Sequence, residues 1–270
     1  MRKESPLRNP RKAWRTMPAV ALMVTIIGVA APARAATNYT ALGDSYSSGV
    51  GTREYYSDSG GCQRSPHAYP VIDAGRLGAS LTFVACSGAT VSGIINGQLG
   101  SLNTSTNYVT VTAGGNDLNW TQVILQCAKP WPYTCWGDID RAEALIRNNL
   151  PALFDQLYSA IKAKAPNARI VAVGYPKLFN GLQCNLVARI SPGEQARLNS
   201  AADLLATTTQ ARAVANGIVF VDARPAYTGH AVCDSVEWIN GTSWPIGESY
   251  HPNRNGQQGY AGIVEAALRG

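Results

Sequence analysis

Five short apolar segments, rich in β-branched residues and bounded by turn residues, recur through the chain. They span residues 39–42, 81–85, 108–113, 169–174 and 218–221. Nearly continuous apolar runs of this length are typical of parallel strands that are covered on both faces. Helical patterns lie between the segments, so strands and helices alternate along the chain. This alternation predicts one α/β domain with a parallel sheet, whose active residues lie on loops at the carboxyl ends of the strands.

The helical patterns have recognisable ends. Asp138 is the expected N-cap of one helix, and Pro166 is its expected stop. Another begins at Ser191, has Pro192 in its first turn, and ends before Gly217. The expected helices span residues 67–77, 138–165, 191–216 and 254–268.

The amino terminus has the pattern of an export signal. Residues 1–35 carry a net charge of +6 and contain an apolar run over 17–30, followed by the small-x-small motif Ala33-Arg-Ala35. The run is shorter than the roughly 20 residues that a membrane span needs. We therefore expect a secretory signal peptide over 1–35 and a single secreted domain over 36–270, with an uncleaved anchor as the alternative.

The charge of the remaining chain bears on its partners. The net charge of the whole chain is +6, so residues 36–270 are neutral, with 16 basic and 16 acidic side chains. Binding to nucleic acid would need a basic stripe, and attraction to anionic membranes would need a basic cluster. We therefore expect no nucleic-acid partner and at most peripheral contact with lipid interfaces, through apolar loops.

Four motifs carry residues that could take part in catalysis. Ser45 comes directly after the first strand, where an exposed nucleophile is expected, although the sequence is not a G-x-S-x-G elbow. Gly88 follows the second strand and can present its N–H with no side chain in the way. Asn116 follows the third strand and can direct an amide N–H to the same place. His251 precedes Pro252, which favours a loop at that point.

In their order and spacing, these motifs resemble the SGNH hydrolases, also called the GDSL lipases and esterases. The resemblance covers residues 43–252 and is closest to secreted actinobacterial lipases and phospholipases with six cysteines. It implies a flavodoxin-like three-layer α/β/α sandwich with a central parallel sheet of about five strands. It also implies that Ser45 is the nucleophile and His251 the general base, then acid. The oxyanion hole would consist of the backbone N–H groups of Ser45 and Gly88 and the side-chain amide of Asn116.

One position departs from the family pattern. The family often has an aspartate three residues before the histidine, where this chain has Glu248. The longer side chain changes the reach and angle of the carboxylate. The resemblance to the secreted branch also implies that a backbone carbonyl near the histidine can replace the carboxylate. We therefore expect a Ser45–His251 dyad in which a backbone carbonyl of Glu248 or Ser249 accepts a hydrogen bond from Nδ1. The carboxylate of Glu248 is the alternative acceptor.

The chain has six cysteines, all of them after residue 35. An even number without a C-x-x-C pair favours disulfides over a metal or redox site, and the sequence alone allows 15 pairings, of which the sequential one is the simplest. The resemblance implies that sequential pairing, which joins Cys62 with Cys86, Cys127 with Cys135, and Cys184 with Cys233.

Other candidate sites are interpreted as structural or excluded. Asp44 and Asp117 are expected to be structural, with Asp117 capping the helix that follows it. The histidines lack metal-ligand spacing, and no dinucleotide or Walker motif is present, so we expect neither metal nor cofactor. Five tryptophans fall in expected loops, where they either line an apolar cleft for acyl chains or pack around disulfides: Trp120, Trp131, Trp136, Trp238 and Trp244.

The combined prediction is a secreted, monomeric serine ester hydrolase. It acts on carboxyl esters of lipids, as a lipase, esterase or phospholipase A1, through an acyl-enzyme on Ser45. A carbohydrate-ester deacetylase on the same scaffold is one alternative. A catalytically silent binding module is another, although the intact Ser45, Gly88, Asn116 and His251 argue against it.

Overall fold

A sheet of five parallel strands lies at the centre of the computed structural model, which describes residues 1, 37–130, 132–184 and 189–270. The strand order is β2-β1-β3-β4-β5, the flavodoxin-like order. The expected signal peptide lies outside the described residues. The strands are β1 (Thr37–Gly43), β2 (Ala79–Phe83), β3 (Tyr108–Thr112), β4 (Arg169–Val173) and β5 (Val219–Val221).

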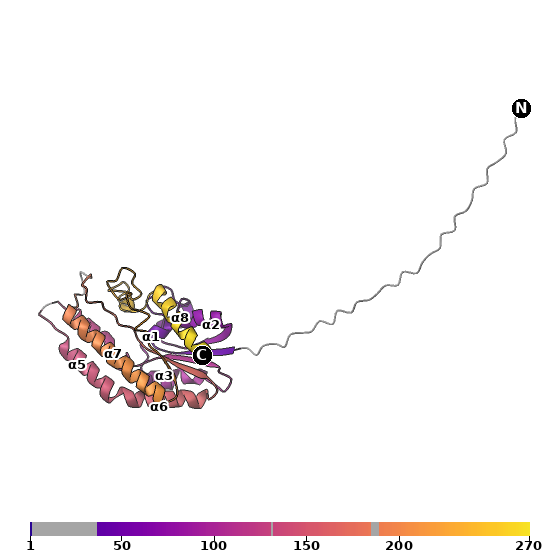
Figure 1. Cartoon of the computed structure of the whole chain (residues 1–270), viewed down its shortest axis with the longest axis horizontal. Helices are drawn as coiled ribbons and strands as arrows, with labels where there is room; N and C mark the ends of the chain where they lie inside the picture. Colours follow the sequence, from indigo (N-terminus) through magenta and orange to yellow (C-terminus); the bar gives the residue numbers. More distant parts are fainter. Residues whose placement is uncertain (2–36, 131, 185–188) are drawn as a thin grey trace. The chain divides into compact units, whose positions relative to one another are not determined.

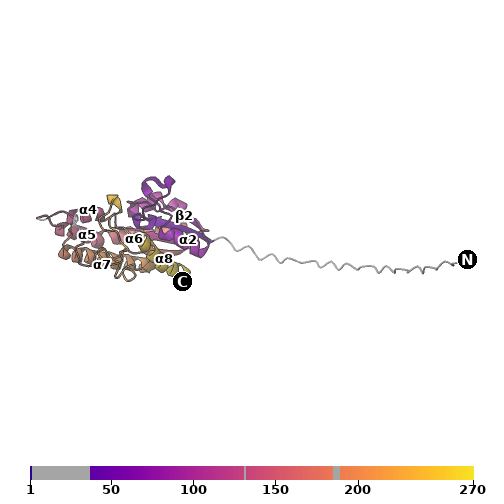
Figure 2. The same cartoon turned by 90° about the horizontal axis from the view of Figure 1, so that it is seen from above.

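Helices cover both faces of the sheet and complete a three-layer sandwich (Figures 1 and 2). On one face, α2 (Tyr69–Leu77) packs against α8 (Arg254–Arg269). On the other, α6 (Leu150–Lys164) lies between α3 (Val91–Gly97) and α7 (Pro192–Ala215), and α5 (Trp136–Asn148) packs against α7. The remaining helical segments are α1 (Ser45–Ser48), α4 (Trp120–Cys127) and the short 3₁₀ turns η1 (Ser57–Cys62), η2 (Leu99–Ser101) and η3 (Ile246–Glu248).

The apolar runs that predicted the strands form the core. The central strands β1, β3 and β4 bury almost all of their residues, whereas the edge strand β2 alternates between half-buried and exposed positions. This difference follows from the strand order, because an edge strand has a neighbour on one side alone. The α/β architecture and the parallel sheet expected from the sequence are therefore confirmed.

The single helix expected over residues 138–165 is wrong. Two helices, α5 and α6, meet at Asn149, which is the C-cap of the first and the N-cap of the second. Pro151 lies in the first turn of α6, where its missing N–H costs nothing, but it could not continue a helix from α5. The expected N-cap was also wrong, because α5 begins at Trp136 and places Asp138 in its first turn.

The strand order brings two of the motifs together. β1 lies between β2 and β3, so the chain leaves β1 toward one edge of the sheet and returns to β3 on the other side of β1. In an open parallel sheet, ligands bind at the carboxyl ends of the strands where the order reverses in this way. Ser45 follows β1 and Asn116 follows β3, so both lie at this switch point.

Three disulfides join loops to this framework, in the sequential pairing. The bond between Cys62 and Cys86 connects η1 to the segment after β2, just before Gly88. The others join Cys127 with Cys135 and Cys184 with Cys233. Within the described ranges, no helix combines the length and the apolar character that crossing a bilayer would require.

Candidate active site

A sharp turn at the end of β1 presents Ser45. Gly43 has a φ of +128°, and a Cβ at this position would lie 2.7 Å from both Ser47 Oγ and the Thr112 carbonyl oxygen, so the turn requires glycine. Asp44 is the N-cap of α1, and its carboxylate accepts a hydrogen bond from the Tyr46 N–H at 3.0 Å. Ser45 is therefore the first residue of a short buried helix and is itself 8% exposed.

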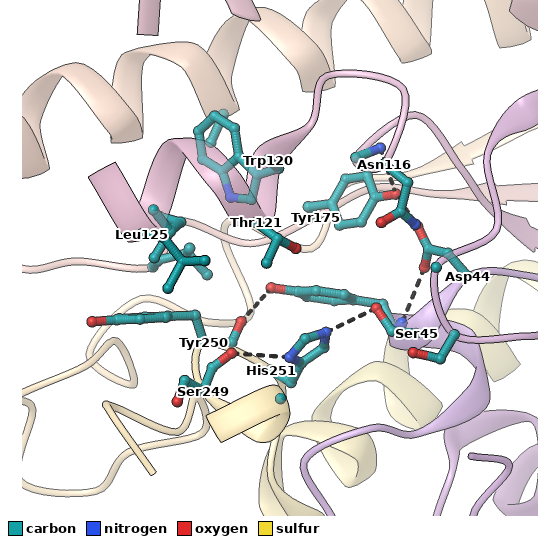
Figure 3. Close-up of a pocket in the computed structure, with 18 of the residues that line it drawn as sticks. Asp44, Ser45, Asn116, Trp120, Thr121, Leu125, Tyr175, Ser249, Tyr250 and His251 are labelled. Atoms are coloured by element: carbon teal, nitrogen blue, oxygen red, sulfur yellow. Dashed lines mark hydrogen bonds between the residues drawn. The ribbon is translucent and has the colours of Figure 1, made fainter. Parts of the chain in front are cut away.

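The His251 ring lies between Ser45 and Ser249 (Figure 3). Its Nε2 is 2.8 Å from Ser45 Oγ, and its Nδ1 is 3.0 Å from the carbonyl oxygen of Ser249. A carbonyl oxygen only accepts, so Nδ1 carries the proton and Nε2 is free to accept one from the serine. The geometry is that of a nucleophile with an oriented base.

One residue of α1, Tyr46, contacts both the His251 ring and the backbone beside it. The Tyr46 ring lies 5.3 Å from the His251 ring, centre to centre, and the Tyr46 hydroxyl donates to the Tyr250 carbonyl at 2.7 Å. Tyr46 therefore links the segment that carries Ser45 to the segment that carries His251. The sequence analysis did not single out Tyr46, although it lies next to Ser45.

The setting of His251 keeps its ring uncharged at neutral pH. Removal from bulk water lowers the pKa of the His251 imidazole from 6.5 to about 4, and the hydrogen bond to the Ser249 carbonyl opposes this shift without reversing it. The ring must be neutral to accept a proton, so a lowered pKa keeps it competent at pH values where an exposed histidine would be charged.

We expect the pH profile of catalysis to record this shift. On a soluble ester, kcat/KM should fall on the acid side with an apparent pKa near 4, because His251 gains its proton there. The profile should be measured after brief exposure to each pH, with a return to neutral pH to exclude unfolding. An acid limb at 6.5 would show that the ring titrates like an exposed histidine and would contradict this account.

Candidate donors from three strand ends line the same cavity: Ser45, Gly88 and Asn116. Gly88 has a φ of +79°, and no atom lies within 4 Å of the place where a Cβ would stand. The backbone N–H groups of Ser45 and Gly88 donate to no other described residue. One amide hydrogen of Asn116 is held by the Ala89 carbonyl at 2.9 Å, which fixes the side chain and leaves the second hydrogen for a ligand.

A tyrosine that the sequence analysis missed ties these strand ends together. The Tyr175 hydroxyl donates to Asp44 Oδ2 at 2.5 Å and accepts from the Gly115 N–H at 3.1 Å. It therefore joins the turn that presents Ser45 to the turn that presents Asn116, from a position just after β4. Burial raises the pKa of the Asp44 carboxyl to about 7, and the hydrogen bond from Tyr175 opposes the rise.

The carboxylates of Glu248 and Asp117 both have partners other than His251 Nδ1. The Glu248 carboxylate is buried and contacts Tyr55 and Arg53, so it is the Ser249 carbonyl that meets Nδ1 of His251. Asp117 was expected to cap the following helix. That expectation is wrong, because its carboxylate accepts from the Val91 N–H at the start of α3, at 3.0 Å.

Ser45 and His251 open into a cavity of about 340 Å³. Its walls are mostly apolar and come from α4, the segment after β4, α7 and the 242–251 segment: Trp120, Ile124, Leu125, Leu178, Ala201, Ala202, Leu205 and Ile246. Asp44 is the one carboxylate among the described lining residues, and none of them is Lys or Arg. Of the four described tryptophans that the sequence analysis singled out, Trp120 lines the cavity, whereas Trp131 lies outside the described residues.

The described residues hold no cluster of three or more His, Cys, Asp or Glu side chains that could bind a metal ion. His67 pairs with Glu54 at 2.8 Å, and His230 stacks on Trp238 with ring centres 3.9 Å apart. Both therefore have partners away from Ser45.

Comparisons with known proteins agree with this geometry. Residues 41–258 match the GDSL-like Lipase/Acylhydrolase family. Lipase 1 of Streptomyces coelicolor is 41% identical over 242 residues, which cover 88% of this chain and 89% of that protein. The crystal structure of phospholipase A1 from Streptomyces albidoflavus NA297 superposes with a TM-score of 0.82 at 41% identity, over 86% of this chain and 100% of that one. An extracellular lipase from Streptomyces rimosus gives a TM-score of 0.81 at 38% identity, again over 86% and 100%.

Proposed function

Because the chain belongs to the GDSL-like lipase/acylhydrolase family and is a carboxylic ester hydrolase, we propose that it hydrolyses lipid esters through an acyl-enzyme on Ser45. The observation that carries this proposal is the 2.8 Å contact between His251 Nε2 and Ser45 Oγ at the wall of an apolar cavity. A serine hydroxyl is a weak nucleophile near neutral pH, so it needs such a base.

The proposed reaction has two halves. In the first, Ser45 Oγ attacks the ester carbonyl carbon while its proton moves to His251 Nε2. The carbonyl oxygen becomes negative, and the N–H groups of Ser45, Gly88 and Asn116 stabilise it. His251 then gives the proton to the leaving alcohol. In the second half, His251 takes a proton from water, the resulting hydroxide attacks the acyl-enzyme, and the proton returns to Ser45 Oγ as the acid leaves.

The cavity supports an acyl chain as the group that Ser45 receives. Its apolar walls from α4 and α7 can bury methylene groups, each of which contributes about 0.8 kcal/mol when removed from water. A site for acetyl groups alone would not need walls of this extent.

Filling the cavity should shorten the preferred acyl chain. Ala202 on α7 lines it, so Ala202→Phe is expected to lower kcat/KM for p-nitrophenyl octanoate by about 10- to 100-fold and to leave the acetate ester within about twofold. Val214→Phe is the matched control, because Val214 lies on the same helix and is 65% exposed. Equal losses on both esters would show that the α7 wall does not hold the acyl chain.

A substrate panel tests the lipid class itself. Triacylglycerol, phosphatidylcholine and acetylated xylan should be compared with the same enzyme preparation. The proposal predicts release of fatty acid from the lipids and little or no acetate from xylan. Activity confined to acetyl groups on the carbohydrate would overturn it.

The export signal expected over residues 1–35 supports action outside the cell. We propose that the secreted domain is a monomer that meets lipid at its surface. Leu125 and Ile246 line the cavity and are 45% and 56% exposed, and nearby in sequence Trp244 is 84% exposed. Large exposed apolar side chains beside a site favour contact with an apolar phase. Because residues 36–270 carry no net charge, we propose that these three apolar side chains make the contact with the lipid interface.

A further inference from the structure

We propose that Glu248 is a positioning residue, whose buried carboxylate holds the segment carrying His251 against the segment that follows Ser45. It acts through the backbone and not on the imidazole. The proposal deepens the function proposed above and rests on it for the meaning of His251. Glu248 lies three residues before His251.

Both carboxylate oxygens of Glu248 point to the 51–55 segment. Oε1 accepts from the Tyr55 hydroxyl at 2.7 Å, and Oε2 forms an ion pair with Arg53 Nε at 2.8 Å without an aligned hydrogen bond. The Glu248 side chain is 4% exposed, so its charge requires these partners. Burial, and after it the hydrogen bond to Glu248, raise the pKa of the Tyr55 hydroxyl to about 12. A carboxylate held in this way is not available to His251.

Further contacts tie the same two segments together. The guanidinium of Arg53 also donates to the Trp244 carbonyl, and the Asn240 amide donates to the carbonyls of Gly51 and Glu248, at 2.9 Å and 3.3 Å. Arg53 has a φ of +68°, a left-handed conformation that a non-glycine residue adopts at a cost. The surrounding contacts therefore hold Arg53 in the conformation that places its guanidinium on Glu248.

Glu248, which we call the anchor, lies one residue before Ser249, whose carbonyl orients the His251 ring. Ser249 directly follows Glu248, and its carbonyl accepts from His251 Nδ1 at 3.0 Å. The His251 N–H in turn lies 3.4 Å from the Glu248 carbonyl, so the backbone folds back on itself between the anchor and the base. A shift of Glu248 would therefore move the Ser249 carbonyl away from Nδ1. Displacing a catalytic group by about 1 Å is enough to cost roughly 10²-fold in rate.

The test compares Glu248→Ala and Tyr55→Phe with the control Tyr56→Phe, which changes a neighbouring tyrosine that is 40% exposed. Proton NMR at neutral pH should show the His251 Nδ1–H as a downfield resonance, assigned by its loss in His251→Asn. Both test variants should shift or broaden this resonance, and the control should not. On p-nitrophenyl acetate, Glu248→Ala should lower kcat by about 10- to 100-fold and Tyr55→Phe by about 3- to 10-fold, with KM within about twofold.

A double variant separates the anchor from a general loss of packing. If Tyr55 acts through the carboxylate, Tyr55→Phe should cost no further activity once Glu248→Ala is present. Tyr55→Phe removes one oxygen, so it keeps the test valid even if Glu248→Ala does not fold.

Two results would overturn the proposal. One is an unchanged resonance and an unchanged kcat in Glu248→Ala. The other is a loss of about 10³-fold or more in Glu248→Ala with wild-type behaviour in Tyr55→Phe, which would mean that the carboxylate acts on the ring itself. Failure of the proposed function would look different: the wild type would hydrolyse no ester, while the NMR comparison would still test the anchor.

Discussion

Ser45→Ala is expected to lower kcat on a soluble ester by about 10⁴- to 10⁶-fold, because the variant has no nucleophile to form the acyl-enzyme. What remains would come from substrate binding and the oxyanion donors. Ser45 is buried in a short helix, and alanine fits there without a new clash or an unpaired group that water cannot reach, so the fold should survive. Circular dichroism and the thermal midpoint would check this.

Ser87→Ala is the matched control for Ser45→Ala. Ser87 also lines the cavity, but its hydroxyl has no contact with His251 among the described hydrogen bonds. It should lose less than about tenfold in kcat, as expected of a substitution outside the reacting atoms. Comparable losses in both variants would mean that the cavity, and not the Ser45 hydroxyl, limits the rate.

His251→Asn is expected to lower kcat by about 10⁴-fold or more at neutral pH, because among the described residues His251 is the one hydrogen-bond partner of Ser45 Oγ that can take its proton. The acid limb near pKa 4 should disappear from the residual activity as well, since His251 is the group that titrates there. Steady-state kinetics on p-nitrophenyl acetate over the same pH range would measure both.

The chain offers two controls for this variant. His67→Asn removes a ring that pairs with Glu54, and His230→Asn removes one that stacks on Trp238. Each should keep activity within about tenfold of the wild type. If either variant fell as far as His251→Asn, the assignment of the base would be wrong.

The parts of the fold that could be predicted are those with a local signal. Parallel strands bury both faces, so their apolar runs stand out in the sequence, and all five were found with ends that differ by at most two residues. The helix α7 carries a capping box between Ser191 and Glu194, which fixes its start. By contrast, α3 and α4 are only seven and eight residues long and neither begins with a capping box, so they were not predicted.

The parts of the site that could not be predicted depend on contacts between distant segments. Residues after the strand ends were singled out because strand order brings such positions together. Tyr175 was missed, because its link between Asp44 and Gly115 appears only when β1, β3 and β4 lie side by side. Likewise, nothing in the sequence around Glu248 shows that Tyr55 and Arg53, almost 200 residues earlier, bind its carboxylate.

In the proposed mechanism, His251 acts as the base without a carboxylate on its Nδ1, because the Ser249 carbonyl takes that place. A neutral carbonyl fixes the tautomer of the ring but offers less stabilisation to the imidazolium than a carboxylate would. In this chain the low pKa of His251 fits that arrangement, because the base stays neutral until it receives the serine proton. The negative charge of Glu248 is neutralised by Arg53 and serves to place the backbone.

Covalent labelling tests the central claim most directly, that Ser45 is a nucleophile activated by His251. The wild-type protein should be treated with a fluorophosphonate at neutral pH, and the modified peptide identified by mass spectrometry. The account predicts one modification, on Ser45, which is absent in Ser45→Ala and far slower in His251→Asn. No labelling of the folded wild type, or labelling at a residue other than Ser45, would contradict it.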